Sequence, residues 1–282
     1  MTVLRAACRG PRAAWPPGLL AALAPLAALA ALAPLAALAL TACRGAPPDR
    51  QQAATLAQLV DSLRPSVERV AGLRFRTAPR SAMKTRNEVR AYLLQKLDEE
   101  LPPERMLGVE AAYRLFGLIP DSLALRSLLV DLYTEQVAGF YDPETATLYG
   151  VEGVDRSQLV LVMAHEMVHA LQAQFTALDS LLHLKGDGDR LAAAQAILEG
   201  QANLVSIEML VPDAATNAVF WETFLENLKT EQARMTVFSS APRVVREGLL
   251  FPYITGAEFM RWWKQSAFRD TVPYGPRMPV ST

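Results

Sequence analysis

The segment from residue 157 to residue 175 is apolar on most faces of a helix, yet it holds two of the three histidines of the chain. A helix that is apolar nearly all round is buried in the centre of a fold. His165 and His169 are four residues apart, so both lie on one helix face with Glu166 beside them. Buried imidazoles and carboxylates need partners. The segment must therefore pair these groups with other polar groups or bind a cation.

The spacing of His165 and His169 favours a metal site. Two imidazoles one turn apart can bind one zinc ion, and two histidines with one carboxylate leave a fourth position for water. Glu166 then takes a proton from that water as it attacks a carbonyl group. We predict one Zn²⁺ per chain, bound by the two histidines, with Glu166 as general base. The alternative is a buried histidine pair without a metal.

The third ligand must come from a distant part of the chain. Glu199 lies in an apolar helix expected at about residues 189–210, where an unpaired charge is costly and a metal would compensate it. The alternative is a Glu199 that faces solvent or forms a salt bridge. His183 and Asp187, in the polar stretch between the two helices, are weaker candidates.

The remaining pattern predicts a mainly α fold of the α+β type. Residues 137–141 and 146–151 flank an Asp-Pro turn and predict a β-hairpin just before the histidine helix. Residues 51–135 have helical spacing, with Pro65 as an interruption, Thr85 opening a capping box and Asp121 as an N-cap. Further helices are expected at about 214–235 and, after the stretch 246–253, at about 256–267. We expect 51–135 and 136–282 to form one domain.

The first 42 residues are not expected to belong to the fold. Three arginines without an acidic residue precede an Ala/Leu run from about residue 19 to 40, which ends in Leu40-Thr41-Ala42-Cys43. This order is typical of a secretory signal, and its end resembles the lipobox of bacterial lipoproteins. By that resemblance 1–42 is a signal peptide, Cys43 is lipidated and 43–50 is a tether. The protein would be exported and lipid-anchored to the cell envelope, in the outer membrane where there are two. The alternative is an uncleaved transmembrane helix.

The composition beyond residue 42 excludes several classes of site. It has 25 basic and 29 acidic residues, and a net charge of −4 gives no support for nucleic-acid binding. No cysteine follows Cys43, which excludes structural disulfides, cysteine metal ligands and a cysteine nucleophile in the body of the chain.

The sequence His165-Glu166-Met167-Val168-His169, followed by a helix with Glu199-Gly200-Gln201-Ala202, resembles the gluzincin group of zincin metallopeptidases. The resemblance implies a zincin-like helical domain that hydrolyses peptide bonds, with His165, His169 and Glu199 on zinc and Glu166 as base. It also implies an edge strand that binds extended peptide. That edge would include Phe140, Tyr141 and Leu148.

More narrowly, residues 138–143, 165–174 and 251–256 are similar to a set of uncharacterised bacterial proteins grouped with the metallopeptidases. Asn203 departs from the gluzincin pattern, which often has an aspartate there to orient a histidine. Its amide oxygen is expected to accept from a histidine N–H without charge. Tyr253 is expected to stabilise the oxyanion because Pro252 and Gly256 restrict its backbone. A core tyrosine is the alternative, and Tyr141 is the reserve.

Two functions remain open from the sequence. The first is a lipid-anchored zinc peptidase that acts on peptides or proteins at the envelope membrane. The second is a non-hydrolytic, metal-containing envelope factor that binds extended polypeptide along the hairpin edge. Retention of Glu166 favours the enzyme, because a pure binder has little use for a general base.

Overall fold

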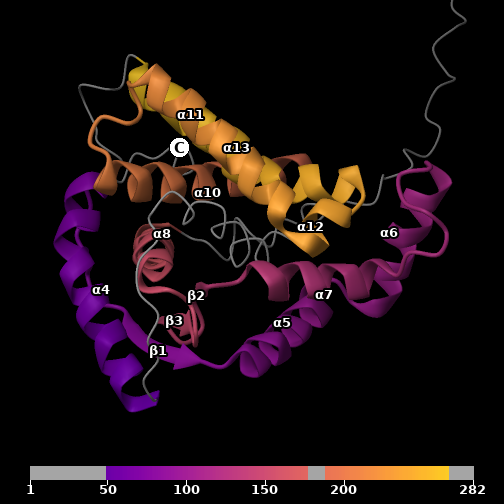
Figure 1. Ribbon diagram of the computed structural model, residues 1–282, viewed down its shortest axis with the longest axis horizontal. Coiled ribbons are helices and arrows are strands. Elements are labelled where there is room, and N and C mark those ends of the chain that lie inside the picture. Colours follow the sequence, from indigo (N-terminus) through magenta and orange to yellow (C-terminus); the bar gives the residue numbers. More distant parts are fainter. Residues whose placement is uncertain (1–48, 177–187, 267–282) are drawn as a thin grey trace, which may run out of the picture.

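The structure is a computed structural model and describes residues 49–176 and 188–266 (Figure 1). Its elements are α4 (Asp49–Ala71), β1 (Arg80–Lys84), α5 (Arg86–Glu100), α6 (Pro103–Leu115), α7 (Leu125–Gln136), β2 (Gly139–Asp142), β3 (Thr147–Val151), α8 (Arg156–Phe175), α10 (Gly188–Leu210), α11 (Ala218–Arg234), α12 (Thr236–Ser240) and α13 (Arg243–Gln265). Helices dominate, and the strands form one sheet in the order β1-β3-β2. The predicted mainly α class with a small sheet is confirmed.

The sheet contains the predicted hairpin and one strand that was not predicted. β2 and β3 pair antiparallel, with Phe140 opposite Tyr149. β1 pairs parallel to β3 and begins with Arg80 opposite Thr147. The prediction of only helices for residues 51–135 was wrong at β1. Its sequence Arg-Ser-Ala-Met-Lys has no β-branched or aromatic residue, so pairing with β3 rather than local propensity makes it a strand.

Helix α8 lies at the centre of the described part of the molecule. It packs against α4, α10 and β2, and Figure 1 shows it nearly end-on between them. Its N-terminus is capped by Asp155, whose side chain accepts from the Ser157 N–H. Every residue from Leu161 to Gln172 is buried. Other elements thus cover the apolar faces of α8. The polar side chains of the same stretch, including His165, Glu166 and His169, are buried as well.

Two hydrophobic clusters hold the elements together. One joins α4, α8, α10 and parts of α11 and α13, with Val67, Met163 and Leu204 in its interior. The other joins α5, α6, α7 and α12 around Leu129. The sheet contributes to both, since Leu148 belongs to the first cluster and Phe140 to the second. Residues from 51–135 and from 136–266 therefore pack in common clusters.

Two helices continue through prolines that were expected to lie outside or to interrupt a helix. Helix α4 runs through Pro65, and it begins at Asp49, inside the predicted tether. Helix α13 begins at Arg243 and includes Pro252, so the predicted start near residue 256 was wrong. A proline inside a helix costs about 3 kcal/mol. Both helices have buried apolar residues on either side of the proline, which offset this cost.

Two helix starts also differ from the prediction. Helix α7 begins at Leu125 with Ala124 as N-cap, and the Leu125 N–H donates to the Glu110 carboxylate at 3.0 Å. Asp121 does not cap it. Helix α11 begins at Ala218 because Asn217 accepts from the Phe220 N–H.

The predicted signal peptide and Cys43 lie outside the described residues. Within residues 49–176 and 188–266, no helix is long and apolar enough to cross a membrane.

Candidate metal centre

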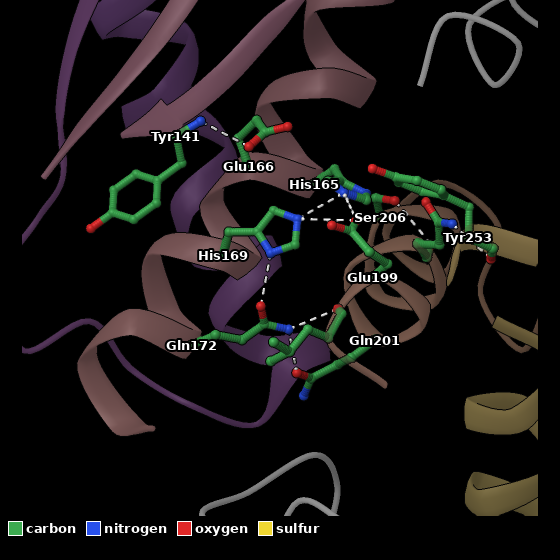
Figure 2. A network of polar contacts seen from close by, with 11 residues as sticks. Tyr141, His165, Glu166, His169, Gln172, Glu199, Gln201, Ser206 and Tyr253 are labelled. Atoms are coloured by element: carbon green, nitrogen blue, oxygen red, sulfur yellow. Dashed lines mark hydrogen bonds and ion pairs between the residues drawn. The ribbon is translucent and has the colours of Figure 1, made fainter. Parts of the chain in front are cut away.

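Helices α8 and α10 bring His165, His169 and Glu199 together (Figure 2). His165 Nε2 lies 3.0 Å from His169 Nε2. Glu199 Oε2 lies 3.1 Å from His165 Nε2 and 3.3 Å from His169 Nε2. All three residues are buried. One atom from each residue thus points at a common centre.

This donor set fits a zinc ion. Nitrogen and oxygen ligands stand 2.0–2.1 Å from zinc, so two of them in a tetrahedral site are about 3.3 Å apart. The three separations, 3.0, 3.1 and 3.3 Å, are close to that edge length. Three lone-pair atoms this close repel one another unless a proton or a cation lies between them. Two imidazoles and one carboxylate also suit other divalent transition metals, so the donor set alone does not select zinc.

The electrostatics of the trio keep its carboxylate ionised. Burial raises the pKa of Glu199, but the two histidines outweigh burial and hold it well below its usual range. Burial lowers the pKa of His165, which favours the neutral imidazole. Burial also lowers the pKa of His169, but the Glu199 and Glu166 carboxylates outweigh it and raise the value. The raised pKa of His169 keeps that ring protonated beside the ionised Glu199 carboxylate, so a bound cation would take the place of the His169 proton.

Glu166 lies beside the trio and is not one of the three converging ligands. Its Oε2 accepts from the Tyr141 N–H at 2.9 Å. Its Oε1 is buried and has no hydrogen-bond partner among the described residues. Burial raises the pKa of Glu166 to about 8. One carboxylate oxygen is thus held in place by the sheet while the other is free to exchange a proton near neutral pH.

Strand β2 approaches α8 closely enough to make this contact because residue 139 is glycine. A Cβ on Gly139 would lie 2.5 Å from Met163 Cε and 2.7 Å from the Tyr149 carbonyl oxygen. The register pairs the Phe140 backbone with β3 and turns the Tyr141 N–H outward, toward Glu166. β2 is an edge strand, so this outward side of its backbone is not paired by another strand.

The predicted substrate edge needs a correction. Leu148 lies on β3, the central strand, whose backbone is paired on both sides, and its side chain is buried. Leu148 therefore cannot form part of an open edge. The Phe140 side chain is also buried in a cluster, which leaves the backbone of β2 and the half-buried Tyr141 for that role.

Tyr253 reaches the centre from α13. It is 4% exposed, and its ring lies 6.2 Å from the His165 ring at an interplanar angle of 23°. Its hydroxyl has no partner of regular geometry within the described ranges. Burial and the carboxylates of Glu199 and Glu166 raise the pKa of Tyr253 well above its usual value. The hydroxyl therefore keeps its proton and remains a donor.

Asn203 lies one turn beyond Glu199 and connects α10 to α13. Its Nδ2 donates to the Tyr253 carbonyl oxygen at 3.0 Å. Burial lowers the pKa of His165, and the polar side chain of Asn203 raises it in part. Neither His165 Nδ1 nor Asn203 Oδ1 has a regular partner in the part of the chain that the structure describes. Asn203 is thus close enough to act on His165, but without a hydrogen bond of regular geometry.

One residue of the site was not predicted. Gln172 Oε1 lies 2.8 Å from His169 Nδ1. Its position three residues after His169, on the same helix face, is the sequence signal that would have found it. His183 and Asp187, the weaker ligand candidates, lie outside the described residues.

No protein-family model, curated protein or solved structure matches this chain.

Proposed function

We propose that this protein is a zinc-dependent peptidase. The observation that carries the proposal is the convergence of His165, His169 and Glu199 on one point, with a fourth buried group, Glu166, beside them and outside the ligand set. A structural metal site needs ligands only, whereas a hydrolytic site also needs a base.

His165, His169 and Glu199 would hold the ion through Nε2, Nε2 and Oε2. When bound there, zinc would polarise a substrate carbonyl and lower the pKa of water. Glu166 would accept a proton at Oε1 while the Tyr141 N–H holds Oε2 in place. The Tyr253 hydroxyl, which has kept its proton, would donate to the oxygen on which negative charge develops.

Substrate binding would use the outward backbone groups of β2 other than the Tyr141 N–H, which is bound to Glu166. An extended peptide can add to an edge strand through backbone hydrogen bonds. The edge lies against α8 at Glu166, which would bring a bound peptide close to the proposed base. This arrangement supports a peptide or protein substrate.

We propose the cell envelope as the location, with a lipid on Cys43 as the anchor. The support is the sequence alone: the arginines, the apolar run and the Leu40-Thr41-Ala42-Cys43 ending. Lipidation is tested by mass spectrometry of the mature N-terminus, and a Cys43→Ala variant is expected to leave the membrane fraction.

The function is tested by metal analysis together with cleavage of a broad peptide library, with and without a chelator. We expect one zinc per chain and chelator-sensitive cleavage. Glu166→Gln should keep its zinc and lose turnover by at least a hundredfold. The matched control is Glu222→Gln, an exposed glutamate on α11, which should cleave like the wild type. Unchanged cleavage by Glu166→Gln would rule out Glu166 as the base.

The second candidate is a non-hydrolytic, metal-containing factor that binds extended polypeptide. It is favoured by Asn203, which has a neutral amide where a carboxylate would orient the histidine more strongly. The same library decides between the two, because this candidate binds peptides in the zinc-loaded form and releases them intact.

A further inference from the structure

We infer that Gln172 is a positioning residue that sets which nitrogen of His169 binds the metal and that ties together the two helices carrying the ligands. The inference rests on the proposed metal site and adds to it a residue outside the ligand set.

Gln172 is 1% exposed and uses both ends of its amide. Its Oε1 lies 2.8 Å from His169 Nδ1. Its Nε2 donates to the Leu198 carbonyl oxygen at 2.9 Å and to Gln201 Oε1 at 2.9 Å. Figure 2 shows the side chain between His169 and α10. The amide therefore makes three polar contacts, one within its own helix and two across to α10.

The Leu198 contact determines the orientation of this amide. A backbone carbonyl oxygen can only accept, so the atom of Gln172 that faces Leu198 must be the nitrogen. The oxygen then faces His169, and because it too can only accept, His169 Nδ1 must carry a hydrogen. The lone pair of a neutral His169 is left on Nε2, the atom that faces His165 and Glu199.

The same amide links the ligands in space. Leu198 directly precedes Glu199, so the Nε2 contact joins α8 to α10 at the residue next to the carboxylate ligand. Without this link the His169 ring can rotate, and the separation of the two helices is less closely defined. Residues that orient a ligand histidine in this way typically contribute 10–100-fold to metal affinity.

The test uses two substitutions, of which only one is expected to weaken metal binding. Gln172→Met has a similar length and forms none of the three hydrogen bonds, so it should weaken zinc binding 10–100-fold in competition with a chromogenic chelator. Gln172→Glu still offers an acceptor to His169 Nδ1–H but presents an acceptor to the Leu198 carbonyl. It should lose thermal stability while keeping zinc affinity within threefold of the wild type or above it.

A purely structural role predicts a different pattern, in which affinity falls in parallel with stability in both variants. The matched control is Gln174→Met on the same helix. The Gln174 side chain accepts from the Arg76 N–H, in the segment between α4 and β1, and does not contact the site. Its zinc affinity should stay within twofold of the wild type. A cobalt-substituted Gln172→Met protein should also show weaker, shifted visible absorption, reporting a less ordered ligand set.

Three results overturn the inference. If Gln172→Met binds zinc as tightly as the wild type, Gln172 does not position His169, although the proposed metal site stands. If Gln172→Glu loses affinity as Gln172→Met does, the acceptor at His169 is not the cause. If the wild-type protein binds no metal at all, the proposed function and the inference both fail.

Discussion

Gly200 and Gly256 lie face to face where α10 packs against α13. A Cβ on Gly200 would stand 2.1 Å from the Gly256 carbonyl carbon, and one on Gly256 would stand 1.9 Å from the Ala196 carbonyl oxygen. The two helices therefore touch backbone to backbone. Gly200 directly follows Glu199, and Gly256 comes one turn after Tyr253, so this contact sets the distance between the Glu199 carboxylate and the tyrosine.

Gly256→Ala should force the two helices apart. A methyl group there meets backbone that cannot move aside, and overpacking of this kind costs about 3 kcal/mol. Urea unfolding should show that loss. Gly108→Ala on α6 is the control, because a Cβ there meets nothing within 4 Å and should stabilise the protein by about 0.5–1 kcal/mol. Equal effects of the two changes would mean that the close contact is not present in solution.

Gly139→Ala should impair catalysis while leaving the metal bound. The added methyl group pushes β2 away from Met163, and the Tyr141 N–H then loses its contact with Glu166. We expect kcat/KM to fall by about tenfold or more, with zinc content unchanged. Gly150→Ala, on the paired residue of β3, is the control, because its closest neighbours are the flexible side chains of Met83 and Leu56. A similar loss in both variants would count against a specific role for the β2 contact.

Zinc should stabilise the folded protein through the three ligands. A ligand that binds only the native state, at a concentration 100 times its Kd, adds about 2.7 kcal/mol. The Tm should therefore rise with added zinc and fall with chelator. Glu199→Ala removes one of the three converging ligands, and its Tm should not respond to either. A variant that still gained the full zinc-dependent shift would show that the metal binds elsewhere.

Glu100 should make stability fall as pH rises. Burial raises its pKa to about 8, from an ordinary 4.5, so ionisation is disfavoured in the folded state. The contribution of protonated Glu100 to the free energy of unfolding is therefore full below about pH 4.5 and is lost as the pH rises toward 8. Glu100→Gln, which stays neutral, should exceed the wild type in free energy of unfolding by about 4 kcal/mol at pH 8 and match it near pH 4.5.

The control for Glu100 is its neighbour Glu99, which is exposed and whose pKa is lowered by hydrogen bonds from Gln95 and Lys96. Glu99→Gln should show no gain in stability between pH 4.5 and 8. A pH-independent difference between Glu100→Gln and the wild type would mean that Glu100 is solvated or paired in the folded protein.

The sequence by itself determined the features that follow from local periodicity. His165 and His169 share a face because a helix brings residues four apart into line, and the capping box of Thr85 and Glu88 opens α5 as predicted. The hairpin around Asp142-Pro143 also follows from residues close in the chain. Each of these depends on contacts within a few residues, where the period of the backbone fixes the geometry.

Only the tertiary structure decided which distant groups complete the site. It brings Glu199 to the histidines and places Tyr253 beside His165. It also allows Gln172 to donate to the Leu198 carbonyl oxygen. It also makes a strand of residues 80–84 and carries α13 through Pro252. These features depend on contacts between segments far apart in the chain. There, the free energy of burying apolar faces and pairing strands exceeds the local preferences that a sequence pattern reports.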